Sequence, residues 1–389
     1  MGGEWRECHL AELTENFDAL RMPVKEADRQ SGPYPYYGAS GIVDHVDSFL
    51  FDGEYLLIAE DGENLRTRKT PVAFLARGKF WVNNHAHIVR GNRLADTRFL
   101  MYALSSVDIE AYLTGSTMPK LTQGNMNRIA LLAPPLSAQR SIARVLGSLD
   151  DKIDLNRRMS ETLEAMARAL FVSWFKRGQT SRKKATDLIA EGILEIGDGY
   201  RAKNSELGAP GLPFVRAGDL DSGFNLAGAA VLSAESVVKA GAKAGRPGDV
   251  AFTSKGTIGR FARVDSQTPR FVYSPQVCYW RSLDRERLHP AILYCWMLGD
   301  GFRAQIDAVA GQTDMALYVS LRDQRQMEVP VFAADQAMVG DEIETILERQ
   351  SSLAHESEAL AALRDTLLPK LISGELRIPD AERIVGEVA

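Results

Sequence analysis

The 389-residue chain contains one long segment twice. Residues 134–170 and residues 330–367 each begin with Pro, carry Gln five or six positions later and continue as a helical pattern. A region rich in Gly and in β-forming residues precedes each copy. A long helix after each of two globular regions constrains the fold to two similar modules, which the helices would hold a set distance apart.

The first copy predicts a helix over about residues 137–176. Its apolar positions recur in alternating steps of four and three, which is the pattern of a coiled-coil seam. Ser137 is a suitable N-cap and Gly178 a suitable stop. The seam positions are Ile142, Leu146, Leu149, Ile153, Asn156, Ser160, Leu163, Ala167, Leu170 and Trp174.

The second copy predicts a helix over about residues 335–373, with Gly374 as its stop. The same alternation of four and three marks its seam. The seam positions are Val339, Ile343, Ile346, Gln350, Leu353, Ser357, Leu360, Arg364, Leu367 and Leu371.

The two helical segments carry opposite charge. Residues 137–181 contain 8 Lys and Arg against 5 Asp and Glu, whereas residues 331–389 contain 5 against 12. This complementarity favours pairing of the two helices with each other over pairing of either with its own copy. We predict an antiparallel pair, because a whole module intervenes and can return the chain to the far end. The alternative is two unrelated amphipathic helices, each packed on its own module. Forty helical residues at ~1.5 Å each make a spacer of roughly 60 Å.

The globular region 1–136 contains strand-like runs at residues 55–59, 72–75 and 80–82. Gly53, Gly62 and Gly78 are expected to form turns between them, and a short helix is expected over 98–104. The region 179–330 repeats this order of landmarks with different side chains. Residues 53–57, 80–86, 101–102 and 115–117 correspond to residues 248–252, 271–277, 293–294 and 311–313.

Composition narrows the class of protein. The chain starts without a basic segment followed by an apolar run, and no stretch approaches the ~20 apolar residues that span a bilayer. Cys8, Cys278 and Cys295 are scattered, which favours reduced thiols in a cytoplasm over disulfides or a zinc site. The net charge of −5 does not decide the partner, because residues 182–330 carry 19 Lys and Arg against 17 Asp and Glu.

The sequence lacks the usual catalytic motifs. It has no phosphate-binding loop and no Gly-x-Gly-x-x-Gly after a strand, and residues 133–136 lack the pattern that holds an adenine for methylation. His85 and His87 would share one strand face, where a metal could bind. Without a third ligand at a suitable spacing, strand packing or DNA contact is favoured. Ser116 and Thr117 lack a His partner. We therefore expect a chain that is non-catalytic by itself and has no cofactor or metal of its own.

Several segments resemble the specificity (S) subunits of type I restriction–modification enzymes. Residues 135–140, 149–153 and 170–175 are similar to the first central region of that family. Residues 367–376, Leu-Leu-Pro-Lys-Leu-Ile-Ser-Gly-Glu-Leu, are similar to its C-terminal signature. With residues 81–86 and 273–275, the resemblance covers essentially the whole chain.

The resemblance implies an α+β fold with an internal pseudo-two-fold repeat. Two α/β target recognition domains would be joined by two long helices that form an antiparallel coiled coil. The expected parts are target recognition domain 1 (1–136), the first spacer helix (137–178), target recognition domain 2 (179–330), the second spacer helix (331–376) and a C-terminal tail (377–389).

The resemblance also implies a function. Each domain would read one half of a bipartite, asymmetric site on double-stranded DNA. The coiled coil would dock two modification subunits, which methylate adenine with S-adenosylmethionine. Two restriction or motor subunits, which use ATP and Mg, could complete the complex. The chain would be a cytoplasmic antiviral-defence protein without membrane contact.

Candidate DNA-binding residues follow from chemistry. Bases are read by Arg, Lys, Asn and Gln, and phosphates are bound by Lys, Arg, Ser, Thr and backbone amides. Lys255 and Arg260, which flank Gly256 and Gly259, are the strongest candidates, although any candidate could be a solvated or turn-stabilising residue. In the first domain the candidates are Arg66, Arg68, Lys69, Asn83, Asn84, His85, Ser116, Thr117 and Lys120, with Tyr36 and Tyr37 equally compatible with the core. In the second they are Arg216, Lys255, Thr257, Arg260, Tyr273, Ser274, Gln276, Gln312 and Thr313.

Two other classes of function stay open at this point. One is an interaction scaffold whose modules bind proteins, with the coiled coil as the assembly element and without sequence-specific DNA binding. The other is an enzyme whose site lies unrecognised in the Gly-rich modules.

Overall fold

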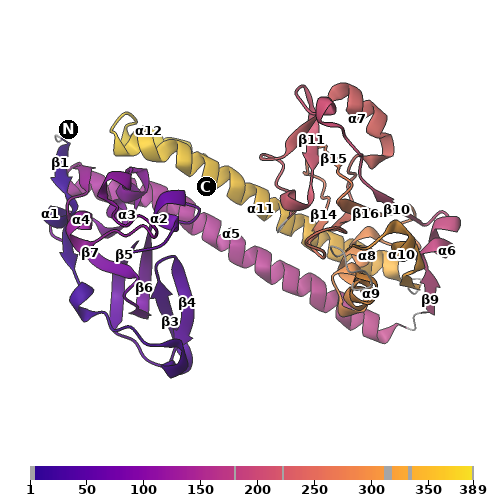
Figure 1. The fold of residues 1–389 in the computed structure, drawn as a ribbon, viewed down its shortest axis with the longest axis horizontal. Coiled ribbons are helices and arrows are strands. Elements are labelled where there is room, and N and C mark those ends of the chain that lie inside the picture. Colours follow the sequence, from indigo (N-terminus) through magenta and orange to yellow (C-terminus); the bar gives the residue numbers. More distant parts are fainter. Residues whose placement is uncertain (1–4, 179–180, 221–222, 311–317, 332–334, 388–389) are drawn as a thin grey trace. The chain divides into compact units, whose positions relative to one another are not determined.

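The computed structural model describes residues 5–178, 181–220, 223–310, 318–331 and 335–387 (Figure 1). Its contacts divide the chain into two compact units. Unit 1 contains residues 1–155 and 357–389, and unit 2 contains residues 156–356. We call residues 1–136 module 1 and residues 179–330 module 2. Each unit therefore holds one module together with half of each long helix.

Module 1 is built on a six-stranded sheet of order β2-β7-β5-β6-β3-β4. Its strands are β2 (Thr14–Asn16), β3 (Ser31–Gly38), β4 (Gly41–Val46), β5 (Phe51–Ala59), β6 (Ala73–Val82) and β7 (Ala86–Gly91). All neighbours are antiparallel except β3 and β6, which pair in parallel. A separate pair, β1 (Arg6–His9) with β8 (Ala130–Ala133), leads into the first long helix.

Short helices complete module 1. They are α1 (Leu10–Leu13), α2 (Asn64–Thr67), α3 (Thr97–Ser106) and α4 (Gln123–Asn127), with 3₁₀ turns at Asp18–Leu20, Glu26–Asp28 and Glu110–Tyr112. The helix expected over residues 98–104 is confirmed as α3. Asp96 caps it by accepting hydrogen bonds from the backbone N–H groups of Arg98 and Phe99.

Two of the expected glycine turns are wrong. Gly53 and Gly78 lie inside β5 and β6 and face each other in the ladder, so residues 73–75 and 80–82 belong to one continuous strand. Both residues have positive φ, 136° and 74°. Glycine adopts this conformation without a steric penalty, so both strands twist locally and continue. Gly62, also at positive φ, lies in the loop after β5 as expected.

Module 2 repeats the pairing of module 1 in smaller sheets. The orders are β10-β16-β13-β14, β12-β11-β15 and β17-β9. The strands are β9 (Ser181–Lys184), β10 (Leu194–Asp198), β11 (Gly211–Val215), β12 (Ala230–Ser233), β13 (Val250–Thr253), β14 (Phe261–Arg263), β15 (Val272–Tyr273), β16 (Val277–Ser282) and β17 (Glu328–Val331). The helices are α6 (Ala185–Ala190), α7 (Ala234–Ala240), α8 (Pro290–Met297), α9 (Asp300–Ala310) and α10 (Leu321–Gln326), with 3₁₀ turns at Asn204–Glu206, Ala217–Asp219 and Gly241–Lys243.

The internal repeat extends to strand register. The parallel pair β3–β6 joins Tyr36 to Trp81, and the parallel pair β11–β15 joins Phe214 to Val272. The pair β1–β8 corresponds to β9–β17. The long strand β6 corresponds to two short strands, β14 and β15, which belong to different sheets. The break between them explains why one sheet in module 1 becomes two in module 2.

The long helices are α5 (Leu136–Arg177) and α11 (Gln336–Ile372). In unit 1, Ile142 and Leu149 of α5 share a core with Leu367 of α11. In unit 2, Trp174 of α5 shares a core with Ile343 of α11. The first half of one helix thus packs on the second half of the other within each unit, so the predicted antiparallel pairing is confirmed.

Every expected seam position is buried or half-buried. Two of its polar members, Asn156 and Arg364, pair across the helices. Asn156, which is 1% exposed, donates a hydrogen bond from Nδ2 to Glu356 Oε2 at 2.8 Å in unit 2. In unit 1, Arg364 Nη1 lies 2.7 Å from Asp150 Oδ1. Asp150 also accepts a hydrogen bond from Tyr102 of α3, so one carboxylate joins both helices to module 1.

The segment expected to be a C-terminal tail contains a further helix, α12 (Ile378–Gly386). Ala381 and Val385 are buried in the core of unit 1. Gly374 ends α11 at a φ of 75°, and a Cβ there would lie 2.9 Å from the indole nitrogen of Trp5. The close approach requires glycine and lets the chain turn back onto module 1.

Candidate nucleic-acid interface

Three segments of module 1 that are distant in sequence meet at one end of its sheet. The Glu60 N–H donates to the His85 carbonyl at 2.9 Å, and the Leu121 N–H donates to the Glu60 carbonyl at 2.8 Å. Asp61 and Lys120 form an isolated antiparallel bridge. The backbone bonds therefore hold residues 60–61, 85 and 120–121 as one rigid group.

Most module 1 candidates lie on or beside this group. Arg66 Nη2 donates to the Gly115 carbonyl at 3.1 Å, which ties the loop after β5 to the loop 114–120. The exposed candidates are Arg66, Arg68, Lys69, Asn84, His85, Ser116, Thr117 and Lys120. The structure therefore brings most of the predicted residues onto neighbouring loops.

Two module 1 candidates have visible structural roles. Asn83 is 8% exposed, and its Oδ1 accepts a hydrogen bond from the His85 N–H at 2.8 Å, which shapes the turn between β6 and β7. Arg68 adopts a φ of 48°, and its guanidinium donates to the carbonyls of Ser105 and Val107 at the end of α3. Tyr36 is fully buried and belongs to the core.

A charged network lies beneath the exposed loops of module 1. Glu60 Oε2 is 2.7 Å from Arg21 Nη1, and Glu60 Oε1 is 3.3 Å from Lys120 Nζ. Burial opposes ionisation of Glu60, but the hydrogen bond from Arg21 and the charge of His87 hold its pKa below the usual value. Lys120 is thereby held by a carboxylate that stays ionised.

The two histidines of the His85-Ala86-His87 segment do not share a site. His85 lies in the turn, and its Nδ1 is 2.8 Å from Asp61 Oδ2. His87 lies in β7, where its Nδ1 is 2.6 Å from Asp18 Oδ2 and its Nε2 is 2.8 Å from the Leu121 carbonyl. Separate carboxylates thus engage the two rings, and the expected shared strand face is wrong because β7 begins only at residue 86.

Module 2 contains the same three-segment arrangement. The Ser254 N–H donates to the Gln276 carbonyl at 3.0 Å, and the Val319 N–H donates to the Ser254 carbonyl at 2.9 Å. Lys255 and Tyr318 form the isolated bridge. We call the two groups the three-segment frames: residues 60–61, 85 and 120–121 in module 1, and residues 254–255, 276 and 318–319 in module 2.

The candidates of module 2 divide into exposed and buried ones. Lys255, Thr257, Gln276 and Arg216 are exposed, and Arg260 is half-buried with Nη1 donating to the Leu220 carbonyl at 3.0 Å. Tyr273 and Ser274 are buried instead, at 0% and 2% exposure. Gln312 and Thr313 lie outside the described residues.

A buried ion pair in module 2 was not predicted from the sequence. Arg281 on β16 makes two hydrogen bonds to Asp249, at 2.7 and 2.8 Å, and both side chains are at most 5% exposed. Tyr273 adds a third at 3.1 Å, and burial raises its pKa well above the ordinary value. No local motif marks this group, because its members come from separate segments.

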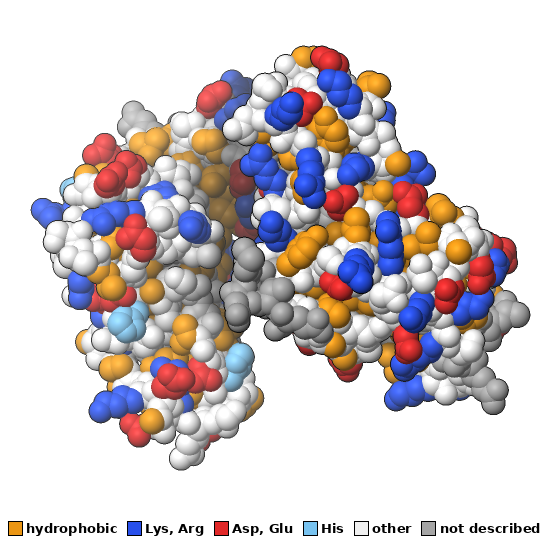
Figure 2. Space-filling model, turned by 45° about the vertical axis from the view of Figure 1, so that its right-hand side comes forward, with side chains coloured by type: hydrophobic (Ala, Val, Ile, Leu, Met, Phe, Trp, Pro, Cys, Tyr) orange, Lys and Arg blue, Asp and Glu red, His pale blue; other side chains and the backbone are white. Residues whose placement is uncertain are grey.

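The surface of unit 2 carries unpaired cations. Figure 2 shows Lys and Arg side chains spread over its visible face. Among the described residues, Arg201, Lys203, Arg216 and Lys255 are exposed and have no salt-bridge partner. Free cations of this kind suit the binding of a phosphate backbone.

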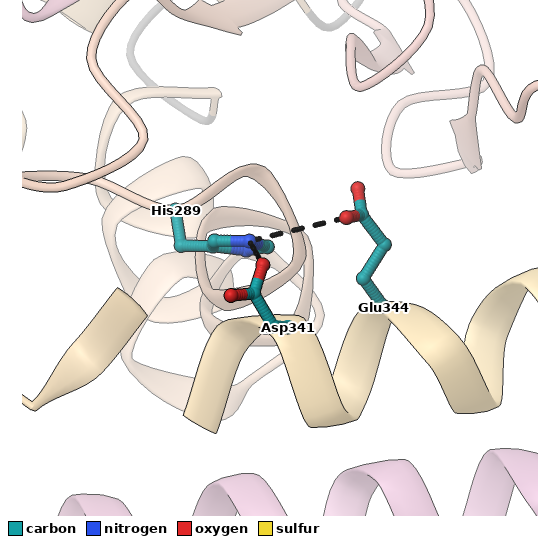
Figure 3. A group of neighbouring side chains, drawn as sticks. All are labelled: His289, Asp341 and Glu344. Carbon is teal, nitrogen blue, oxygen red and sulfur yellow. Dashed lines mark hydrogen bonds and ion pairs between the residues drawn. The ribbon is translucent and has the colours of Figure 1, made fainter. Parts of the chain in front are cut away.

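One cluster has the composition of a metal site. His289, Asp341 and Glu344 converge as shown in Figure 3, with His289 Nε2 at 3.2 Å from Asp341 Oδ1. The guanidinium of Arg285 lies among them, at 3.0 Å from Asp341 and 2.6 Å from Glu344. An arginine thus supplies the cation, and the cluster joins module 2 to α11.

The two modules attach to their long helices through the same residue type. Gln139 Oε1 accepts a hydrogen bond at 3.0 Å from the N–H of Asp96, the N-cap of α3. Gln336 Oε1 accepts one at 2.9 Å from the N–H of His289, the N-cap of α8. The repeated glutamine therefore fixes each module to the start of one long helix.

Comparison with known proteins identifies the family. Residues 2–165 match the model of the type I restriction modification DNA specificity domain. The Haemophilus influenzae protein S.HindORF215P, which carries the name of a type I restriction enzyme specificity subunit, is 30% identical over 282 residues, 69% of each chain. The MjaIX specificity subunit of Methanocaldococcus jannaschii is 24% identical and covers 84% of this chain and 80% of its own.

A solved structure shares the fold. The crystal structure of a type I restriction-modification system S subunit from M. genitalium matches with a TM-score of 0.68 at 17% identity, covering 95% of this chain and 96% of its own. The chain belongs to the family of type I restriction enzyme specificity subunits. Within the described ranges, no helix has the length and apolarity needed to cross a membrane.

Proposed function

We propose that the chain is the non-catalytic DNA-recognition subunit of a type I restriction–modification complex, and that its two modules read the two different halves of a bipartite, asymmetric site. The repeated three-segment frame carries this proposal. Two modules share one backbone arrangement but expose different side chains on it. A shared scaffold with different exposed groups suits the recognition of two different sequences.

The partners follow from the family. The chain would bind double-stranded DNA and two modification subunits, which supply S-adenosylmethionine-dependent adenine methylation. Two restriction subunits with ATP and Mg would add motor and nuclease activity. The chain itself would contribute sequence selection and assembly.

A stripe of exposed apolar side chains on α5 supports docking on the helices. Met159 and Met166, seven residues apart on one face of α5, are 37% and 52% exposed. They lie outside the seam that packs against α11. Met166→Glu should reduce the amount of modification subunit that copurifies. Ala165→Glu places the same charge at an exposed neighbour and should have little effect. Equal copurification of both variants would argue against docking on this stripe.

DNA retention tests recognition itself. The chain is purified with its modification subunits and mixed with a library of DNA duplexes. We expect retention of one bipartite sequence, with an affinity that falls steeply as salt rises because phosphate contacts release counterions. A protein-binding scaffold would retain no sequence in preference to another. Methylation or cleavage of DNA by the purified chain alone would show an enzyme instead.

Domain exchange tests whether each module reads one half-site independently of the other. Replacing residues 1–136 with the corresponding module of another specificity subunit should change one half-site and leave the other unchanged. A change in both half-sites would mean that the modules do not read independently.

A further inference from the structure

The two three-segment frames use the same backbone bonds but carry different side chains. The bridge residue is Asp61 in module 1 and Lys255 in module 2. The turn residue is His85 in one and Gln276 in the other. The equivalence of the backbone bonds makes these positions comparable without any sequence alignment. At the bridge position the charge is inverted between the modules.

The third position of each frame also differs in chemistry. Lys120 occupies it in module 1 and Tyr318 in module 2, and the two are 50% and 47% exposed. The rigid backbone therefore presents three side chains in module 1 (Asp61, His85 and Lys120) and three in module 2 (Lys255, Gln276 and Tyr318). We call these sets the frame triads.

The frame triads are available for contact with a ligand. In module 2, the side chains of Lys255, Gln276 and Tyr318 form no hydrogen bond or ion pair with the described residues; the Ser254 hydroxyl reaches only the backbone carbonyl of Gln276. In module 1, His85 is 53% exposed and uses only Nδ1 to bind Asp61. Its Nε2 has no partner within the described part of the chain. The imidazole is thus oriented by a carboxylate while its other nitrogen stays free.

The layers beneath the frames support the triads differently. In module 1, Glu60 and its ionic partners lie under the frame. In module 2, the same position holds Ser254, whose hydroxyl accepts a hydrogen bond at 3.1 Å from the buried Cys278 thiol. Gln324 continues this neutral network from Cys278 to Trp280. The Glu60 side chain is 14% exposed and Ser254 is fully buried, so in both modules the residues beneath the triad are held in place.

We propose that the frame triads are the specificity-determining positions of the two modules. This rests on the proposed function. In module 2, Lys255 suits the acceptors of guanine, and Gln276 suits the donor–acceptor pair of adenine. In module 1, His85 is the reading group and Asp61 is its positioning residue. An acidic residue beside DNA repels phosphate, so its presence at the frame favours a role in selection over general affinity.

Triad exchange tests the proposal. The triple variant Asp61→Lys, His85→Gln, Lys120→Tyr gives module 1 the triad of module 2. The variant is purified with the modification subunits, and DNA is selected from a library randomised in both half-sites. We expect the base preference at one or more positions of half-site 1 to change by about tenfold, the scale of one good base contact. Half-site 2 should be unchanged.

Glu7→Lys is the matched control. It makes the same charge change as Asp61→Lys at an exposed position of β1. The chain runs from β1 through α1 to β2, which pairs with β7 at residues 89–91, whereas the frame lies at the start of β7. We expect the control to leave both half-site preferences unchanged.

The outcomes distinguish a failure of the proposed function from a failure of the triad proposal. A wild-type complex without sequence preference would reject the proposed function. If the wild-type complex has a preference and the folded triple variant keeps it at every position of half-site 1, the triad proposal alone is overturned. Loss of base preference at both half-sites would also overturn the triad proposal. If the triple variant does not fold by circular dichroism, His85→Gln alone decides, because this exposed side chain makes one ion pair.

Discussion

The repeated glutamines offer the sharpest test of how each module is held. Gln139 is 1% exposed and makes three hydrogen bonds: it accepts from the Asp96 N–H and donates to the carbonyls of Leu94 and Pro134. Met has nearly the same length but makes none of these bonds. Each bond contributes about 0.5–1.5 kcal/mol, so Gln139→Met should cost about 3 kcal/mol locally.

Hydrogen exchange gives a local measurement of this cost. About 3 kcal/mol corresponds to roughly 150-fold faster exchange, because each 1.4 kcal/mol is a factor of ten. We expect this acceleration at the amide of Asp96 and in the first turn of α3 in Gln139→Met. The exchange of unit 2 should not change, because these bonds lie within unit 1.

The second copy supplies an internal replicate. Gln336 accepts from the His289 N–H and donates to the carbonyls of Arg285 and Glu286. Gln336→Met should therefore accelerate exchange at the start of α8 by a similar factor and spare α3. Gln123→Met at an exposed position serves as control. An acceleration below threefold in either variant would refute the view that these bonds fix the modules.

Three further predictions follow from other features. Asp249→Asn should destabilise unit 2 by about 3 kcal/mol, because it removes the carboxylate charge that pairs with buried Arg281 and leaves Glu195, at 3.3 Å, as its ion-pair partner. Chemical denaturation monitored by hydrogen exchange of unit 2 measures this loss, and an unchanged denaturation midpoint would contradict it. Unit 1 should lose stability in acid, because the folded-state pKa values of Asp18 and Glu60 are lowered. Their contribution is present above the unfolded pKa of about 4 and is lost as pH falls through the folded values; exchange protection factors of unit 1 that stay flat down to pH 3 would argue against this. Inserting four residues into both α5 and α11 lengthens each helix by ~6 Å. At ~3.4 Å per base pair, the tolerated gap between the half-sites should widen by one or two base pairs. An unaltered gap in methylation assays would show that the helices do not set the spacing.

The helices were predictable because their signal is periodic and long. An alternation of four and three over forty residues predicted both seams, and the polar position Asn156 was identified as part of one. The strand boundaries were harder to predict from the sequence, because glycines usually mark turns. Gly53 and Gly78 instead lie opposite each other in a continuous strand ladder. Local pattern cannot reveal that a glycine is compensated by a second glycine across the sheet.

The candidate interface was only partly visible in the sequence. Side-chain chemistry placed Lys120 among the candidates, and His85 was included because a pair of histidines without a third metal ligand favoured strand packing or DNA contact. Asp61 and Tyr318, which we propose as members of the frame triads, were not among the sequence candidates, because an acidic residue and an isolated tyrosine give no signal for DNA contact. Tyr273 was included but is buried, since a strand residue and a loop residue look alike when the strand has only two residues. The three-segment frames are held by backbone hydrogen bonds between segments that are far apart in the sequence, so a local sequence pattern cannot predict them.

The composition of unit 1 has a consequence for biosynthesis. Its core contains Leu360, Leu367 and Val385, which are translated after the whole of unit 2. Module 1 leaves the ribosome first, yet it must wait for more than two hundred further residues before its apolar surface is covered. Unit 2, a single uninterrupted stretch, can complete its own core earlier. We therefore expect the N-terminal module to be the last to mature, and a released chain that ends at residue 356 to contain a folded second unit and an unfinished first one.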